Sequence, residues 1–298
     1  MISAFCLTTN AFEMGFPLTE SIKSWLPVID ELIVVDGGST DGTIEAIEKI
    51  GDSKIRIVND KDTKWEKEWT YWRMNHNFNR GFEECKGDII LKFDVDRVLH
   101  EKDYDLFKGD IKKVIDEKYL VMKIARLGVP RIDCYRGQKA HILVLNYGLA
   151  KEKGLDIKYG IDLERVGFHN NFVVLKEKKY KLNLGDMVSE FGKVFNSDIR
   201  EFNYGHGFAT KKQAVENRYQ HYNAIERQGE LMGIGGRFHS RKDITPQVTN
   251  SLTYEGISRH TPLKLKEHPK IMWERVKNIK PTQRAYNVWG KIEKPSYF

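Results

Sequence analysis

Two short acidic clusters in this chain each follow a run of apolar residues. The first lies in Ile33-Val-Val-Asp-Gly-Gly-Ser-Thr-Asp-Gly-Thr43, and the second is Asp94-Val-Asp96, directly after Ile89 to Phe93. Glycines permit a tight turn and close backbone approach, so Asp36 can offer an acceptor to a ribose hydroxyl or a base N–H. Paired carboxylates suit hard cations such as Mg²⁺ or Mn²⁺, which also bind substrate phosphates. Taken singly, the first cluster is typical of a turn with a helix cap, and the second is typical of two solvated acids at the end of a strand.

Alternating strand and helix patterns determine where these clusters lie. Apolar runs predict strands over residues 2–8, 31–36, 54–58 and 88–93. Helical spacing predicts helices over 18–26, 43–50 and 65–84, the second capped by Ser39 or Thr40 with Asp41 in its first turn. Strands joined by such helices form right-handed crossovers and a mostly parallel sheet. Both clusters then fall at the carboxyl edge, where open α/β sheets bind ligands. The two acids face one centre if the chain stays extended through Val95.

The pattern becomes less regular after Lys118. Strands are predicted over 119–126 and 141–146, and a helix over 211–227. The glycine-rich segment 229–236 suits either a moving loop or a plain connector. From about residue 245 the sequence assigns no element. We expect one continuous α/β unit with a C-terminal elaboration.

Composition excludes several classes of protein. The 298 residues are 40% hydrophobic and 31% charged, which suits a chain with a buried core. No apolar run approaches the length of a membrane span, and the N-terminus lacks a secretory pattern. Three cysteines are too few for a disulfide framework, so a reducing cytoplasm is expected. Residues 201–298 carry 17 basic against 9 acidic groups, which suits an anionic partner or a solvated lysine-rich face.

Together, the two clusters resemble those of the family-2 glycosyltransferases, nucleotide-sugar-dependent enzymes with the GT-A fold. The resemblance covers about residues 2–105 and is carried by Ile33 to Thr43, by Arg73 to Asp88, and by Asp94-Val-Asp96, which matches the family's Asp-x-Asp motif. It implies a GT-A-like (Rossmann-like), mostly parallel mixed sheet flanked by helices. Residues 1–210 would form the nucleotide-sugar-binding and catalytic domain. Residues 211–298 would be a basic extension packed on it as a lid or acceptor region.

The resemblance also implies roles for single residues. Thr8 and Glu13 would belong to the first nucleotide loop, and Asp36 would contact uridine or an equivalent nucleoside. Arg73 would approach the base or the diphosphate. Asp94 would contact the ribose or the metal-bound diphosphate. A cation, Mn²⁺ or Mg²⁺, would be held by Asp96 with Asp94 and with His206 of the strand-end segment Phe202-Asn-Tyr-Gly-His-Gly207; as a lone histidine in an aromatic stretch, His206 is equally typical of a structural residue.

The implied reaction moves a sugar from a nucleoside-diphosphate donor, UDP-linked by preference, to a hydroxyl acceptor. The cation would stabilise the diphosphate that leaves, reinforced by basic residues such as Lys211, Arg237 or Arg241 as a lid closes. Inversion would need a carboxylate base. The base candidates are Asp162, Glu164, Asp186 and Glu190, with Asp186 preferred, and each is also typical of a surface acid.

Three departures from the family pattern stand out. The first strand lacks a frequent proline, Gly37 occupies a position where many relatives have an acid, and Arg97 directly follows the second acid. An unusual environment for the metal is therefore expected. The Gln-x-x-Arg-Trp pattern of processive polysaccharide synthases is absent, which argues against that class.

Other functions stay open at this point. A nucleotidyltransferase would need a basic glycine-rich loop near the N-terminus, and residues 8–15 contain no Lys or Arg. A non-catalytic nucleic-acid-binding protein is suggested by the basic C-terminal segment and its aromatic residues. A hybrid is a glycosyltransferase whose acceptor is a hydroxylated nucleic-acid base.

Overall fold

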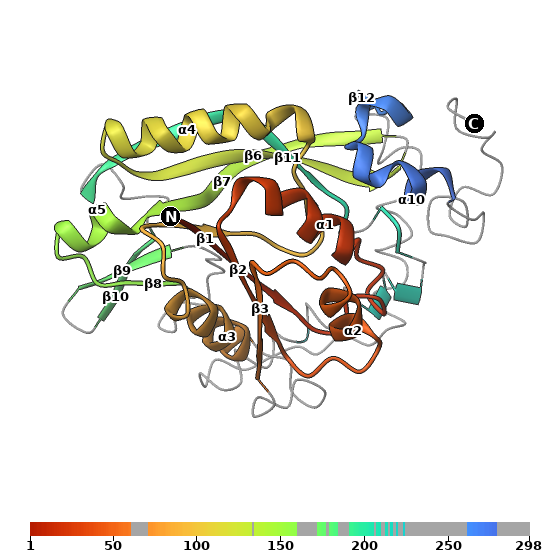
Figure 1. Cartoon of the computed structure of the whole chain (residues 1–298), viewed down its shortest axis with the longest axis horizontal. Helices are drawn as coiled ribbons and strands as arrows, with labels where there is room; N and C mark the ends of the chain where they lie inside the picture. The colour runs from red at the N-terminus through yellow and green to blue at the C-terminus, as the bar shows by residue number, and fades with distance from the viewer. Residues whose placement is uncertain are drawn as a thin grey trace.

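The structure is a computed structural model of the chain (Figure 1). It describes residues 1–60, 71–132, 134–159, 172–176, 179–183, 191–205, 207–209 and 261–278, and a few positions between 212 and 223. No helix in these residues is long and apolar enough to cross a membrane.

A large mixed sheet forms the centre of the described part of the chain. Its strand order is β3-β2-β1-β4-β7-β6-β11-β5, and β12 pairs with β7. The strands are β1 Ile2–Thr8, β2 Glu31–Asp36, β3 Ile55–Asn59, β4 Ile89–Lys92, β5 Arg97–Val98, β6 Tyr119–Arg131, β7 Cys134–Asn146, β11 Lys193–Asn203 and β12 Thr261–Pro262. Strands β3, β2, β1 and β4 run parallel, as do β6 and β11, and the other neighbours are antiparallel. The predicted α/β class with a parallel first half is confirmed.

Helices cover both faces of this sheet. The α-helices are α1 Leu18–Trp25, α2 Thr43–Glu48, α3 Tyr71–Glu83, α4 Tyr104–Asp116, α5 Tyr147–Glu152 and α10 Trp273–Lys277. Short 3₁₀ helices span Leu26–Val28, Glu101–Asp103, Leu265–Glu267 and Lys270–Met272. A small antiparallel sheet joins β8 Ile157–Tyr159, β9 Phe172–Lys176 and β10 Lys179–Asn183. In Figure 1, α4 runs along β6, β7 and β11.

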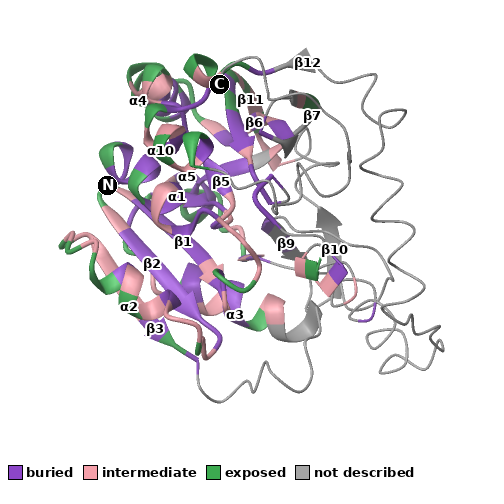
Figure 2. Ribbon diagram, turned by 90° about the vertical axis from the view of Figure 1, so that its right-hand side faces the viewer, coloured by how far each residue is buried: buried purple, intermediate pink, exposed green. Residues whose placement is uncertain are grey.

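Strand alternation explains why both faces are apolar. Successive side chains of a strand point to opposite faces, so a strand that is covered on both sides reads as a continuous apolar run. In β1, Ala4 and Cys6 belong to one core cluster and Phe5 belongs to the other. Burial raises the pKa of the Cys6 thiol well above its usual range, which fits the expected role of a small hydrophobe. The centre of the sheet is accordingly buried on both sides (Figure 2).

A third core cluster ties the segment 261–278 to the far end of β11. Leu263, Met272 and Val276 pack there with Tyr204. His268 Nε2 donates to the carbonyl of Ile132 at 2.8 Å, so its Nδ1 accepts from the Tyr204 hydroxyl at 2.7 Å. The predicted division at residues 210 and 211 stays a prediction, because most of 211–298 lies outside the described residues.

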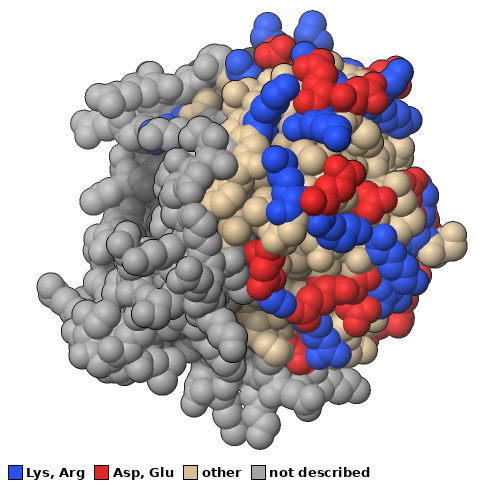
Figure 3. All heavy atoms as spheres, turned by 90° about the vertical axis from the view of Figure 1, so that its left-hand side faces the viewer, with Lys and Arg blue, Asp and Glu red and all other residues tan. Residues whose placement is uncertain are grey.

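On the face drawn in Figure 3, basic and acidic side chains alternate over the coloured part of the surface. Ion pairs such as Lys151–Asp88 (3.0 Å) and Lys158–Glu83 (2.6 Å) connect charges of opposite sign. The described residues on this face therefore carry charges of both signs.

Candidate functional site

The two acidic clusters lie at one edge of the sheet, on either side of β1. Thr8, the last residue of β1, pairs with Asp36, the last residue of β2. On the other side of β1, Phe5 pairs with Lys92, the last residue of β4, and the Phe93 N–H donates to the Phe5 carbonyl at 3.3 Å. Because the three strands are parallel, their carboxyl ends point to the same edge, as the sequence predicts.

Asp36 is held by its own loop. One carboxylate oxygen, Oδ2, accepts the N–H groups of Gly38 and Ser39, each at 2.9 Å. The other oxygen accepts the Ser39 hydroxyl at 2.5 Å. Gly38 has a φ of +90°, which a glycine adopts without strain. The side chain is only 2% exposed, so Asp36 organises the β2–α2 turn while its oxygens border the sheet edge.

The loop that follows β1 is bonded to the same turn. Asp41 Oδ2 accepts the N–H groups of Phe12 and Glu13, each at 2.9 Å. The Asn10 N–H donates to Ser39 Oγ at 2.9 Å. The predicted cap of the next helix is wrong in detail: Asp41 Oδ1, and neither Ser39 nor Thr40, accepts the Thr43 N–H at 3.1 Å, because Gly42 leads the chain into the helix with a φ of +88°.

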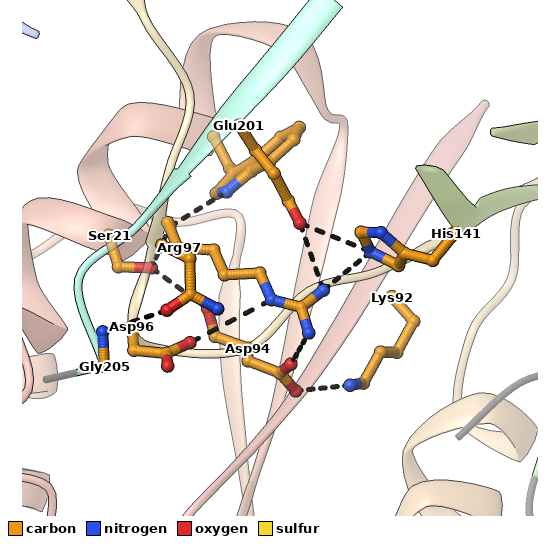
Figure 4. Close-up of polar contacts among 10 residues, drawn as sticks. Ser21, Lys92, Asp94, Asp96, Arg97, His141, Glu201 and Gly205 are labelled. Atoms are coloured by element: carbon orange, nitrogen blue, oxygen red, sulfur yellow. Dashed lines mark hydrogen bonds and ion pairs between the residues drawn. The ribbon is translucent and has the colours of Figure 1, made fainter. Parts of the chain in front are cut away.

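The second acidic cluster forms a tight turn, which corrects the expectation of an extended chain. Strand β4 ends at Lys92, and the Arg97 N–H donates to the Asp94 carbonyl at 3.0 Å. The turn reverses the chain into β5, whose residues pair with β11. Both acids nevertheless face one centre, because the turn brings the Arg97 side chain between them (Figure 4).

Helix α1 supports the backbone of this turn. Ser21 Oγ donates to the Arg97 carbonyl at 2.6 Å, and Trp25 Nε1 donates to the same oxygen at 3.3 Å. The Ser24 hydroxyl accepts the Leu99 N–H at 3.0 Å. These three side chains are fully buried, so α1 fixes the turn through contacts that are shielded from water.

Asp94 is engaged on both oxygens. Oδ1 forms an ion pair with Lys92, and Oδ2 forms one with Arg97. Lys92 is itself buried, with its ammonium 4.5 Å from the centroid of the Phe78 ring. Burial by itself would raise the pKa of Asp94, but the positive charges of Arg97 and Lys92 outweigh it and hold that pKa below its usual range. Asp94 is therefore an ionised, internally neutralised carboxylate.

Asp96 has spare hydrogen-bonding capacity. Its Oδ1 is buried and has no hydrogen-bond partner in the described part of the chain, and Arg97 Nε lies 4.0 Å away. Burial, followed by the charge of Asp94, raises the pKa of Asp96 to about 6. Its carbonyl accepts the Tyr204 N–H at 2.8 Å. A Cβ at Gly205 would overlap Asp96 Oδ2, so only a glycine lets β11 end this close to the acid.

Arg97 is the centre of a buried cluster drawn in Figure 4. Its NH1 lies 2.7 Å from His141 Nε2 and 3.1 Å from Glu201 Oε1. Because a guanidinium only donates, Nε2 of His141 accepts. Burial lowers the pKa of His141 to about 2, with Arg97 and Arg126 contributing. Burial likewise raises the pKa of Glu201, which is 0% exposed, to about 7. The imidazole is therefore neutral.

The structure describes some of the remaining predicted residues and leaves the others undescribed. Thr8 is buried, with no partner for its hydroxyl among the described residues, and Glu13 is exposed beside Asn10. Arg73 belongs to α3, and its side chain is outside the described part. The other candidates lie outside the described residues altogether: Asp162, Glu164, Asp186, Glu190, His206, Lys211, Arg237 and Arg241. The structure therefore brings together Thr8, Asp36, Asp94 and Asp96.

Three residues of this charged cluster were not predicted from the sequence: Lys92, His141 and Glu201. Lys92 is a cation inside an apolar run, which is a usable signal because buried lysines need a partner. Glu201 lies in β11 between the exposed Arg200 and the buried Phe202, and His141 directly precedes an apolar run, but neither position has a motif around it. Their role follows only from the pairing of distant strands.

Comparison with known families identifies part of the chain. Residues 17–108 match the profile of Glycosyl transferase family 2, which confirms the family resemblance for this segment. An uncharacterized glycosyltransferase of Rickettsia conorii is 30% identical over 132 residues, or 44% of this chain and 42% of that protein. One from Rickettsia felis is 29% identical over 132 residues, or 44% and 41%. The chain thus spans less than half the length of these curated relatives.

Two solved structures are also similar to this chain. A mannosyltransferase from Pyrobaculum calidifontis, in complex with GDP-Man and Mn²⁺, has a TM-score of 0.47 and 12% identity, covering 86% of this chain and 74% of that one. The S. aureus protein TarS, residues 1–349 in complex with UDP, has a TM-score of 0.42 and 14% identity, covering 87% and 73%.

Proposed function

We propose that this protein transfers a sugar from a nucleoside-diphosphate donor, UDP-linked by preference, to a hydroxyl acceptor with the help of a divalent cation. The observation that carries this proposal is the Asp94–Asp96 turn. It lies at the same sheet edge as Asp36, and its second acid keeps a buried oxygen without a hydrogen-bond partner among the described residues. The family match of residues 17–108 supports the reaction class.

The chemistry of Asp96 fits a hard cation. An unpaired buried carboxylate oxygen is costly unless a cation or a donor satisfies it. No group of three His, Cys, Asp or Glu side chains in the described residues is arranged to hold a metal by itself. Mg²⁺ and Mn²⁺ suit this arrangement, because such ions bind through one or two carboxylates and take further oxygens from water and substrate phosphates. Asp96 is the residue that would hold the ion, with His206 as a candidate second ligand.

The other residues at the edge suit the organic part of the donor. Asp36 accepts three hydrogen bonds from its own turn, and its free lone pairs border the end of β1, where we assign the nucleoside. The buried Thr8 hydroxyl lacks a partner among the described residues and lies beside Asp36, so we assign it to the same nucleoside. Glu13 and Arg73 keep their expected roles in the nucleotide loop and at the base or diphosphate.

Cleavage of the sugar–phosphate bond leaves a further negative charge on the terminal phosphate of the diphosphate. A bound divalent cation would neutralise that charge. Arg97 and Lys92 keep Asp94 ionised and neutralised, so this acid adds little net repulsion toward the diphosphate. The acceptor hydroxyl needs a carboxylate base if the reaction inverts the sugar, and Asp186 remains the preferred candidate beside Asp162 and Glu190. The proposed compartment is the cytoplasm, which agrees with the free thiols of Cys6 and Cys85.

A thermal-shift screen of nucleoside diphosphates and nucleotide sugars, with and without Mn²⁺, tests the proposal. A ligand that binds only the folded chain raises its melting temperature. We expect a shift with a nucleoside diphosphate, UDP first, that requires Mn²⁺ and disappears in Asp96→Ala. Asp88→Ala is a matched control, because Asp88 precedes the same strand but pairs with Lys151 at the other end. A screen without any shift, or one in which Asp96→Ala behaves like the wild type, would contradict the proposal.

A further inference from the structure

The Arg97 guanidinium has a choice between the two acids of its turn. Its NH2 pairs with Asp94, while its Nε lies 4.0 Å from Asp96 Oδ1. Neither of these last two atoms has a hydrogen-bond partner among the described residues. These two atoms form a long ion pair (Figure 4), and a small movement of the guanidinium that closed it to hydrogen-bond distance would satisfy both atoms and occupy the Asp96 carboxylate. Something must therefore hold Arg97 in its observed orientation.

We infer that Glu201, together with His141, is a positioning residue that anchors Arg97 on Asp94 and thereby leaves the Asp96 carboxylate open to a divalent cation. Both partners receive the same guanidinium nitrogen, NH1, at 3.1 Å and 2.7 Å. With NH1 anchored and NH2 on Asp94, the planar group cannot bring its Nε from 4.0 Å to hydrogen-bond distance of Asp96 Oδ1. The inference rests on the proposed function only in assigning a cation to Asp96.

Strand register explains why Glu201 reaches this arginine. Arg97 of β5 pairs with Asn203 of the antiparallel strand β11. Residues directly opposite each other, and residues two positions apart on one strand, share a face of the sheet. The Glu201 side chain therefore points to the face on which the Arg97 side chain lies. It is 0% exposed, so it reaches Arg97 without competition from water.

A buried glutamate also invites a purely structural reading, in which it only neutralises Arg97. Removing one partner of a buried ion pair destabilises a fold, so a loss of stability alone does not separate the two roles. Cation binding does separate them. In a purely structural role, Glu201→Gln lowers the melting temperature and leaves the affinity of the folded protein for Mn²⁺ unchanged. In a positioning role, Arg97 is released to Asp96 and competes with Mn²⁺.

The test measures Mn²⁺ binding to the full chain by the electron paramagnetic resonance signal of the free ion, without nucleotide, at about pH 8 where carboxylates are ionised. We expect Glu201→Gln to weaken binding by at least about threefold, since a competing cation reaches Asp96. Arg97→Gln should strengthen it by at least about threefold, since that competitor is gone. The double variant should match Arg97→Gln within about twofold, because Glu201 acts only through Arg97.

Matched controls use a second Arg–Glu pair, Arg56 NH1 with Glu84 Oε2 at 2.5 Å, which is remote from the sheet edge. Arg56→Gln and Glu84→Gln should leave Mn²⁺ binding unchanged. Circular dichroism checks the fold of each variant. If Arg97→Gln does not fold, Arg97→Lys takes its place with the same direction and a smaller gain, because an ammonium cannot bridge Asp94 and Glu201 together. If Glu201→Gln does not fold, His141→Asn serves with a smaller weakening.

Three results would overturn the inference: no Mn²⁺ binding by the wild type, loss of binding in Arg97→Gln, or a Glu201→Gln effect that persists undiminished in the Arg97→Gln background. The last result would mean that Glu201 acts directly on the cation. Failure of the proposed function is a separate outcome. A protein that shows the expected Mn²⁺ pattern but consumes no nucleotide sugar refutes the function and keeps the inference. Conversely, a protein that consumes a nucleotide sugar, but whose Mn²⁺ binding is changed by neither variant, keeps the proposed function and refutes the inference.

Discussion

The two acidic turns at the sheet edge are built in different ways. Within the part of the chain that the structure describes, the hydrogen bonds to the Asp36 carboxylate all come from Gly38 and Ser39 of its own loop. The partners of the Asp94–Asp96 turn come instead from α1 and from strands β4, β5 and β11. The Asp36 carboxylate is therefore held by its own loop, whereas the second turn acquires its geometry only when distant strands have paired.

The two turns also differ in how far the hydrogen bonds of their carboxylates are satisfied. The Asp36 carboxylate accepts three donors, which satisfies it without any ligand. Asp96 keeps a buried oxygen without a partner among the described residues, and its pKa is raised to about 6 by burial and by Asp94. Unsatisfied groups of this kind reduce stability and are retained where a ligand completes them. This difference agrees with a cation role for the second turn and with a mainly structural role for the first, whose free lone pairs are left for the nucleoside.

The largest expected effect separates the two acids by activity and stability together. Asp96→Asn should lower kcat by about 10²–10³-fold, the range typical for loss of one group that stabilises developing charge. Its free energy of unfolding should stay equal or rise, because a costly buried charge is removed. Asp36→Asn should instead lower the free energy of unfolding by about 1–2 kcal/mol, because an amide offers one acceptor oxygen in place of two. Steady-state kinetics and urea unfolding measure these changes.

The critical feature of the comparison between Asp96→Asn and Asp36→Asn is that only the second variant should lower the free energy of unfolding. If Asp96→Asn destabilised the fold as much as Asp36→Asn does, both acids would be scaffolding and the contrast between the turns would be lost. The kinetic comparison is made at saturating donor, so that a weaker nucleoside contact in Asp36→Asn affects KM without lowering kcat.

Two glycines sharpen the comparison at the level of the backbone. Gly205→Ala places a methyl group against Asp96 Oδ2, so we expect about a 10-fold or greater loss of kcat as the carboxylate is displaced. Gly38→Ala meets open space, but its φ of +90° makes the backbone strained. That variant should lose about 1 kcal/mol of unfolding free energy with kcat unchanged. Unchanged kcat in folded Gly205→Ala would show that the position of Asp96 is not critical.

The difference between local and distant contacts also explains how much of the structure could be predicted from the sequence. Strand β1 is predicted residue for residue, and β2 likewise, because a parallel strand covered on both faces reads as a continuous apolar run. Strand order then places Asp36, Asp94 and Asp96 at one edge. The first seven residues of β7, Cys134 to Ala140, were missed, since a polar stretch next to a long antiparallel partner has no apolar signature.

The remaining part of the site depends on contacts that no local pattern encodes. Glu201 and Arg97 are separated by 104 positions and meet through the pairing of β5 with β11. His141 lies 44 positions from Arg97. The extended path expected through Val95 was wrong because the Arg97 N–H closes a turn on the Asp94 carbonyl, a choice that helix α1 stabilises from outside the motif.

The dependence of stability on pH tests the distant cluster, with opposite signs for two residues. The pKa of Glu201 is raised from 4.5 to about 7, so between these values the folded chain holds more protons and stability falls as pH rises. The pKa of His141 is lowered from 6.5 to about 2, so the unfolded chain holds more protons and stability rises with pH up to about 6.5. Each slope reaches about 1.4 kcal/mol per pH unit. They oppose each other between about pH 4.5 and 6.5.

Single variants should therefore separate the two slopes. Glu201→Gln removes the falling contribution, so its unfolding free energy should rise with pH more steeply than that of the wild type. His141→Asn removes the rising contribution, so its unfolding free energy should rise less steeply with pH than that of the wild type. The lowered pKa values of His100 and His268 add a rising contribution that all three proteins share. Urea unfolding between about pH 5 and pH 6.5 measures the slopes, and parallel curves for the two variants would refute the assignment of protons.

The smallest expected effect tests whether the turn at Asp36 has only a structural role. The Ser39 hydroxyl donates to Asp36 and accepts the Asn10 N–H, so Ser39→Ala should cost about 1 kcal/mol of unfolding free energy. Asp36 keeps its two backbone donors, so kcat should stay unchanged. Thr40→Ala is the neighbouring control and should change stability by less than about 0.5 kcal/mol, because Thr40 is exposed and uses only its N–H in the turn. A large fall in kcat for Ser39→Ala would mean that the hydroxyl contacts the substrate and that this turn, too, takes part in the chemistry.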